Sequence, residues 1–315
     1  MPVRAVRTIV WDARRNRARV VWLIAIPLVG ALLATSAYTA VPGPLPLPVA
    51  ALLASGAATV AAVLLVVVSS RWLGGRRLGE YGLAIDRRWL LDLTAGLGVG
   101  LLAVSIPFVA AISAGRAEVV AVLDAGDLAL WTGMLVYAVA MLCTGLWEEL
   151  VLRGVFVCNA ADGLRRWLSP HRAVLGGLVL SSLVFALGHL AQTGVSAKLV
   201  TFVLSGLVLG VLYLLSGDLA LVVGAHAGFN ITSNLLFARA GGPTEGLSVI
   251  LRLDVDPSLP LLESGGVLEL AAFGLLGLFG LLWLRYSRAS VSIALVRLRL
   301  DGGPSDVPDG EHSPV

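Results

Sequence analysis

Five ionisable side chains lie in segments of this 315-residue chain that are otherwise apolar enough to cross a lipid bilayer. Glu148, Glu149 and Arg153 share one segment, and His189 and His226 lie in two others. Even on lenient insertion scales, an ionisable side chain near the centre of a spanning helix costs about 2.5 to 3.5 kcal/mol. Because burying these groups is so unfavourable, we take them as candidates for a functional site.

Helical spacing predicts different tasks for the two adjacent glutamates. Glu149 and Arg153 are four residues apart and share one helix face, whereas Glu148 is rotated by about 100° from its neighbour. An ion pair between Glu149 and Arg153 would lower the cost of burying both charges. Glu148 is then left to face a cavity.

The same four-residue spacing relates the polar groups of the other two segments. Phe185 precedes His189 by four residues, and His226 precedes Asn230 by four residues. Each pair therefore projects in one direction from its helix.

One carboxylate, two imidazoles and an amide suit the hydrolysis of a peptide bond by water. That reaction needs a base for the water, donors for the oxyanion and an acid for the leaving amine. Glu148 and His189 can share the base and acid steps, and N–H donors from His226 and Asn230 suit the oxyanion. Since no serine, threonine or cysteine is clearly paired with a base, direct attack by activated water is favoured over a covalent intermediate.

In this order, the three segments resemble the motifs of the CPBP intramembrane proteases. The motifs are Glu-Glu-x-x-x-Arg at Glu148 to Arg153, Phe-x-x-x-His at Phe185 to His189, and His-x-x-x-Asn at His226 to Asn230. This family includes the type II CAAX prenyl endopeptidases and the bacterial Abi proteins. The resemblance implies a membrane-embedded or lipidated peptide substrate and a site open to the cytosol. It also implies that Glu148 and His189 activate water, that His226 and Asn230 stabilise the oxyanion, and that Glu149 and Arg153 support them.

The family is often labelled as metalloproteases, which raises the question of a cofactor. Glu148, His189 and His226 would give a zinc site of two histidines and one carboxylate, with water at the open position. The sequence has no His-Glu-x-x-His helix, and the resemblance implies a metal-free, glutamate-dependent mechanism. We therefore expect no required cofactor and keep zinc as the less favoured alternative.

The composition of the chain predicts the fold that must position these groups. Hydrophobic residues make up 57% of the chain and charged residues 14%, against about 25% charged in soluble domains. The fold class expected is an all-α, polytopic membrane helix bundle. A spanning helix needs about 20 apolar residues, which predicts eight spans: 20–41, 47–68, 90–112, 131–157, 173–190, 199–215, 219–238 and 266–284.

Arginine placement predicts the domain organisation and the orientation. We expect a basic N-terminal tail over 1–19, a transmembrane domain over 20–290 with the motif core at 131–238, and a disordered C-terminal tail over 291–315. Arginines concentrate in the two tails and in alternate loops, which predicts cytoplasmic termini in a plasma membrane. The near absence of lysine is typical of a GC-rich bacterial genome.

The predicted boundaries place the candidate residues at unequal depths. With a rise of about 1.5 Å per residue, Glu148 lies roughly 15 Å from the inner end of its span, and His189 lies roughly 24 Å from the inner end of its own. Tilt, kinks near the glycines or a fifth span that starts deeper would close this gap. The mismatch is also a warning that the predicted boundaries are in error by several residues.

Two other functions remain open at this stage. A proton-coupled transporter would use glutamate and histidine as a relay, although the polar residues have no counterpart in the first half of the chain, as paired repeats would require. A catalytically idle scaffold of the same family is the other alternative. The partners expected are a peptide substrate and the bilayer, without nucleic acid. The sequence selects neither the substrate, prenylated or not, nor an oligomeric state.

Overall fold

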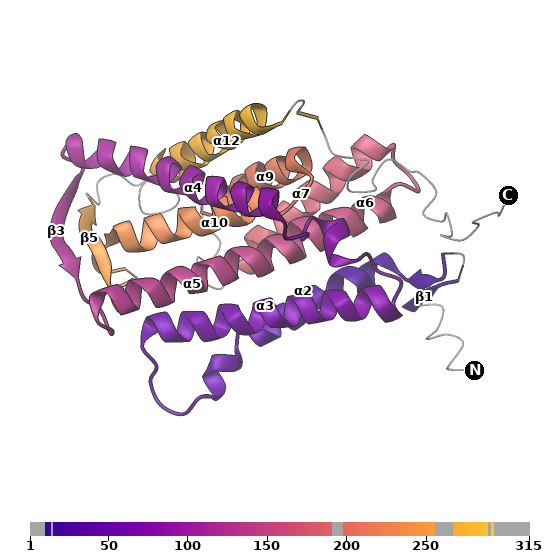
Figure 1. Cartoon of the computed structure of the whole chain (residues 1–315), viewed down its shortest axis with the longest axis horizontal. Helices are drawn as coiled ribbons and strands as arrows, with labels where there is room; N and C mark the ends of the chain where they lie inside the picture. Colours follow the sequence, from indigo (N-terminus) through magenta and orange to yellow (C-terminus); the bar gives the residue numbers. More distant parts are fainter. Residues whose placement is uncertain are drawn as a thin grey trace.

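The computed structural model describes residues 10–13, 15–190, 198–242, 244–255, 267–288 and 291–292. Long helices run side by side along the molecule, with a small sheet at one end and a short hairpin at the other (Figure 1). The predicted C-terminal tail lies outside the described residues, apart from 291 and 292, as do residues 1–9 of the predicted N-terminal tail.

The helices of the bundle carry apolar residues on most of their surface, as expected of segments that face both lipid and protein. Two π-helical segments, η3 and η4, directly follow α5 and α10. The elements are α2 (Val20–Ala34), α3 (Leu47–Trp72), α4 (Arg87–Ser113), α5 (Leu130–Glu149), η3 (Leu150–Val157), α6 (Cys158–Leu164), α7 (Pro170–Gly188), α9 (Lys198–Ser216), α10 (Ala220–Ile231), η4 (Thr232–Leu236) and α12 (Val267–Ser287), with short 3-10 turns η1 (Ala37–Ala40) and η2 (Leu78–Tyr81).

The all-α membrane bundle predicted from the sequence is confirmed. Among the described residues, six helices are long and apolar enough to cross a membrane, and α5, η3 and α6 together form one of them. The other two predicted spans are shorter as helices, because α2 has 15 residues and α10 has 12. The segment predicted as 219–238 leaves the α-helical form after Ile231, continues as η4 and ends in a strand.

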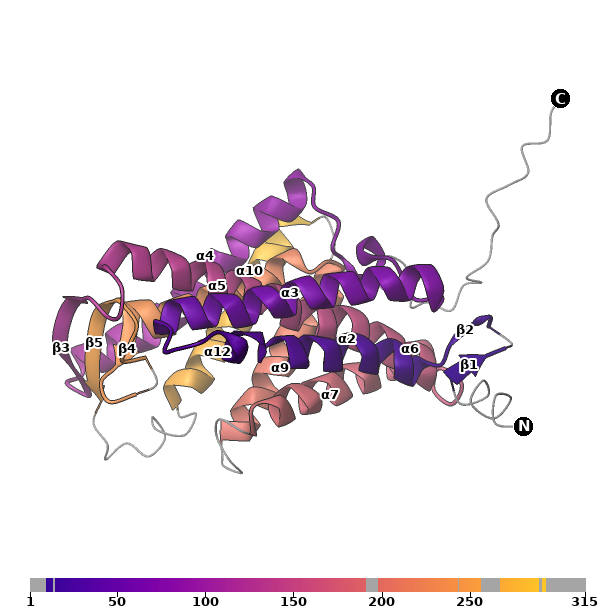
Figure 2. The ribbon, with the colours of Figure 1, turned by 90° about the horizontal axis from the view of Figure 1, so that it is seen from below.

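The two ends of the bundle differ in structure. One end, which we call the sheet end, carries β3 (Ala117–Asp124), β5 (Val249–Val255) and β4 (Phe237–Arg239). The opposite end carries the short hairpin of β1 (Trp11–Asp12) and β2 (Arg17–Ala18), and we call it the arginine end (Figure 2). Helix α2 begins and α12 ends at the arginine end (Figure 1).

The three-stranded sheet was not expected, since the sequence analysis treats its strands as loops and a helix end. β5 is the central strand, antiparallel to β3 and parallel to β4. Val119, Val120 and Val122 give β3 the β-branched composition that favours a strand. Its partner strand lies more than 120 residues away in the sequence, so local patterns could not reveal the pairing.

The continuous helix Leu130–Leu164 extends the predicted span past its expected end at 157. Helix α7 begins at Pro170 rather than at the predicted residue 173. Both predicted boundaries are therefore several residues short.

Glycines bring the backbones of α4 and α10 into direct contact. A Cβ atom added at Gly100 would lie 2.4 Å from the carbonyl oxygen of Ala225, and one at Gly224 would lie 2.1 Å from that of Leu93. Small residues permit this close approach of membrane helices. The contact fixes α10, the helix that carries His226, against the bundle.

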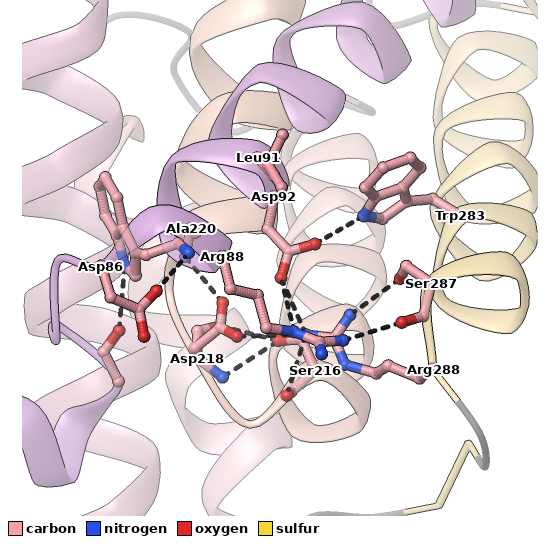
Figure 3. Close-up of polar contacts among 12 residues, drawn as sticks. Asp86, Arg88, Leu91, Asp92, Ser216, Asp218, Ala220, Trp283, Ser287 and Arg288 are labelled. Carbon is pink, nitrogen blue, oxygen red and sulfur yellow. Dashed lines mark hydrogen bonds and ion pairs between the residues drawn. The ribbon is translucent and has the colours of Figure 1, made fainter.

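Ion pairs close the arginine end between elements far apart in the sequence. Buried Asp92 of α4 accepts hydrogen bonds from Trp283 Nε1 at 2.7 Å and from Arg288 Nη2 at 3.0 Å (Figure 3). The same Arg288 nitrogen donates to Asp218 at 3.1 Å, in the turn between α9 and α10. A second group pairs Asp162 of α6 with Arg76 at 3.0 Å and with Arg17 at 3.3 Å.

The α4–α10 contact gives a test with a matched control two residues away. We expect Gly100→Ala to destabilise the protein by about 1 to 3 kcal/mol, because the added methyl group meets main-chain atoms that cannot move aside easily. Gly98→Ala should have little effect, since nothing lies within 4 Å of a Cβ atom there. Thermal unfolding in detergent measures both variants, and equal melting temperatures would contradict the packing described.

Candidate active site

Five of the seven residues selected from the sequence surround one cavity of about 480 Å³. Glu148, Phe185, His189, His226 and Asn230 all line it, and they come from three separate helical segments. The remaining two, Glu149 and Arg153, form the supporting pair and do not line the cavity. The tertiary structure thus brings together groups that the sequence separates by up to 82 positions.

The supporting pair is fully enclosed by protein. Glu149 is 0% exposed and Arg153 is 1% exposed. Arg153 Nε lies 3.1 Å from Glu149 Oε2, and the other oxygen, Oε1, lies 2.8 Å from His226 Nδ1. Glu149 therefore joins the arginine of its own helix to the histidine of α10.

Glu148 lies on the cavity side of this group. Its Oε2 atom is buried without a hydrogen-bonding partner in the protein, at 3.8 Å from His226 Nε2. That separation is longer than a direct hydrogen bond. A buried carboxylate oxygen without a hydrogen-bonding partner destabilises the fold unless a water molecule or a ligand group binds it. The geometry therefore favours a bound water molecule or a polar ligand group beside Glu148.

Aromatic contacts hold Arg153 and His189 in place. The Phe185 ring centre lies 4.7 Å from the Arg153 guanidinium carbon, close enough for a cation–π interaction. The same ring meets the His189 ring edge-on, with centroids 4.7 Å apart, and the His226 ring at 6.2 Å. Phe185 therefore contacts both imidazoles, and Phe202 stacks on the His189 ring at 4.0 Å.

The two remaining polar residues sit at helix ends. His189 directly follows α7, and its Nδ1 atom lies 2.9 Å from the carbonyl oxygen of Phe185. Asn230 is in the last turn of α10, one turn after His226, and its carbonyl oxygen accepts a hydrogen bond from Asn234 Nδ2 at 2.8 Å.

Two of the helices that carry candidate residues change to π geometry near them. η3 begins directly after Glu149, and η4 begins at Thr232, two residues after Asn230. Short π-helical segments are rare and frequently occur at functional sites. In this protein they place Arg153 beside Glu149 and turn Ser233 and Asn234 toward the cavity.

Several cavity residues were missed by the sequence analysis. Thr144 lies four residues before Glu148, and Ser233 and Asn234 lie three and four residues after Asn230. Their helical spacing from known site residues was the signal that could have identified them. The other polar residues of the lining, for which no such signal exists, are Tyr137, Thr201, Ser205, Arg239, Thr244 and Glu269.

The structure also bears on the zinc alternative. Within the described parts of the chain, no group of three or more histidine, cysteine, aspartate or glutamate side chains is arranged to hold a metal ion. Glu148, His189 and His226 all line the cavity, where His226 Nε2 lies 3.8 Å from Glu148 Oε2 and Nδ1 is held by Glu149. The three side chains do not form a three-ligand group among the described residues.

Comparison with known proteins gives one match. The family model described as "Rce1-like: Type II CAAX prenyl endopeptidase Rce1-like" matches residues 130–232. The matched segment runs from α5 to the start of η4 and contains all seven residues selected from the sequence, which confirms the resemblance inferred from the motifs. The comparisons with curated proteins and with solved structures gave no match.

The buried pair behind the cavity makes a stability prediction. We expect Arg153→Met to destabilise the protein by about 3 to 5 kcal/mol, because Glu149 would remain buried without its counter-charge. Arg165→Met serves as control, since Arg165 is partly exposed at 3.8 Å from Asp162, a contact worth at most about 1 kcal/mol. Denaturant unfolding in detergent measures the difference.

A double variant distinguishes two causes of the stability loss in Arg153→Met: the uncompensated charge of Glu149 and the altered packing. Glu149→Gln combined with Arg153→Met removes both charges, so it should be more stable than Arg153→Met alone. If the double variant were no more stable than the single one, the uncompensated charge would not explain the loss.

Proposed function

We propose that this chain, whose residues 130–232 belong to the Rce1-like type II CAAX prenyl endopeptidases, hydrolyses a peptide bond within the membrane by means of a water molecule that Glu148 activates. The observation that carries the proposal is the buried Glu148 oxygen, which faces the cavity without a protein partner. The substrate is a membrane-embedded or lipidated peptide.

Glu148 is the general base of this mechanism. It takes a proton from the water as the water oxygen attacks the carbonyl carbon of the substrate, which gives a tetrahedral oxyanion. Glu149 is assigned no such task because it does not line the cavity, and its two oxygens lie 3.1 Å from Arg153 Nε and 2.8 Å from His226 Nδ1. The two neighbouring carboxylates therefore have separate roles, one facing the cavity and one holding the support.

His226 and Asn230 stabilise the oxyanion. Glu149 accepts the Nδ1 proton of His226, so Nε2 donates to the oxyanion only when the ring is an imidazolium. A protonated His226 makes the group of Glu148, Glu149, Arg153 and His226 neutral overall, the favourable state for charges buried together. Asn230, one turn along α10, supplies the second donor from its side-chain amide.

His189 completes the reaction at the leaving amine. Its Nδ1 atom is directed to the Phe185 carbonyl, which leaves Nε2 as the ring nitrogen that exchanges the proton. When the C–N bond breaks, the amine nitrogen takes the proton removed from the water, passed on through Glu148 and His189. Stacking on Phe202 fixes the orientation of the ring.

No required metal enters this mechanism. Zinc bound at Glu148, His189 and His226 would lower the pKa of a bound water molecule and polarise the carbonyl group. Such a site would need the three side chains to converge on one point, and among the described residues they form no such group. The carboxylate base and the two donors supply the proton transfer and the charge stabilisation.

The base assignment is tested with Glu148→Gln in reconstituted protein. We expect peptide cleavage to fall by about 10² to 10⁴-fold, the contribution typical of a positioned general base. Glu118→Gln, on an exposed strand residue, is the matched control and should keep full activity. Mass spectrometry of membrane peptides from both variants gives the readout, and undiminished turnover by Glu148→Gln would refute the assignment.

The cofactor proposal has its own measurement. After prolonged dialysis against a strong chelator, the protein should retain its rate of peptide cleavage, because the mechanism uses only side chains and water. Elemental analysis of the dialysed sample is the control for removal of bound zinc. Loss of activity that returns on addition of zinc would instead establish a metal-dependent reaction.

A further inference from the structure

The cavity extends from Glu148 toward one end of the bundle. On α5 its lining continues from Glu148 through Thr144 and Met141 to Tyr137, toward the sheet end. On the segment after α10 it reaches Ser233 and Asn234, and it continues to residues 239 and 244 beside the strands. The cavity thus reaches from the candidate active site to residues beside the sheet.

From Glu148 toward the arginine end, the interior of the bundle is filled by packed side chains. None of the residues from Leu150 to Leu164 lines the cavity, nor does any residue of the described range 210–225. Leu150, Val151, Tyr213 and Leu221 are fully buried there and pack in the main hydrophobic core. The ion pair of Asp92 with Arg288 (Figure 3) lies beyond this core and joins helices at the arginine end. The ion pair of Asp162 with Arg76 does the same.

The charges of the two ends are unequal. Among the described residues, the sheet end has three arginines, Arg116, Arg239 and Arg252. The arginine end has many more, and short cytoplasmic loops carry such an excess. These are Arg15, Arg17, Arg19, Arg71, Arg76, Arg77, Arg87, Arg88, Arg165, Arg166, Arg172, Arg285 and Arg288.

We infer that the substrate reaches Glu148 from the sheet end, which is the face opposite the cytoplasm, and that it is an amphipathic peptide segment presented on that face. The inference rests on the proposed function. It differs from the expectation of a site open to the cytosol, because the packed core lies between the active site and the arginine end.

The walls of the cavity define the chemistry of this peptide. On one side α4 and α12 supply mostly apolar side chains, with Phe108, Phe273 and Leu276 among them and Glu269 as a charged exception. Phe273 stacks on Phe229 of α10 at 4.7 Å. On the other side α5 and the segment after α10 supply hydroxyl and amide groups at Thr144 and Asn234. An extended segment with one apolar face and exposed main-chain polar groups matches both walls.

Cysteine labelling tests the direction of access without a known substrate. Ser233→Cys places a thiol in the cavity wall, and Ser169→Cys places one at an exposed position of the arginine end. Wild-type protein, with Cys143 and Cys158, gives the background. A membrane-impermeant maleimide is applied to sealed vesicles of each orientation, with a permeant maleimide to show that both thiols react.

We expect Ser233→Cys to be labelled only from the outer face and Ser169→Cys only from the cytoplasmic face. Labelling of both thiols from the same face would overturn the inference. Labelling of Ser233→Cys by the permeant reagent alone would also overturn it, since the cavity would then open to neither aqueous face.

A second measurement identifies the substrate face and separates the two proposals. Peptides that accumulate in membranes carrying Glu148→Gln, compared with wild type, should be amphipathic and have their cleavage positions on the outer side. Cleavage positions on the cytoplasmic side would refute the inference. Unchanged peptides in the Glu148→Gln sample would refute the proposed enzyme function, whereas the labelling result would stand independently.

Discussion

The site depends on one buried network of polar contacts. Arg153 pairs with Glu149, Glu149 binds His226, and His226 faces Glu148. Glu149 and Arg153, which lie behind the cavity wall, are almost completely removed from solvent, and His226, which lines the cavity, is also buried. Charges in such surroundings persist only when each is compensated at close range. The contact with Glu149 therefore fixes the orientation of His226. The position of His226 in turn limits where a water molecule or a polar ligand group can bind beside Glu148.

Helix packing makes this arrangement rigid. The glycines of α4 and α10 let their main chains touch, which leaves α10 little room to slide or rotate. π geometry after Glu149 and after Ile231 shifts the following side chains relative to an ideal α-helix. Rigid support of this kind is what an oxyanion site requires, because its donors must be in place before the negative charge develops.

The two ends of the bundle differ in their contacts: one is held by ion pairs, and the cavity reaches toward the other. At the arginine end, carboxylates such as Asp92 and Asp162 each bind more than one partner, and these contacts connect helices that are distant in the sequence. At the sheet end, a short sheet and polar loop residues surround the cavity. The proposed reaction needs water and substrate at one position while the rest of the core stays dry, and the packed core beside the cavity is compatible with both requirements.

The sequence by itself determined the membrane class and the approximate helices, and it selected candidate residues of which five line one cavity. These follow from local rules, because apolar length defines a span and four-residue spacing places Glu149 beside Arg153, and His189 beside Phe185. Only the tertiary structure decided that Glu149 also holds His226, 77 positions away, and that β3 pairs with β5. It also decided the extension of the helix to Leu164 and the direction of the cavity. Those features depend on packing between distant segments, whose energies no local pattern records.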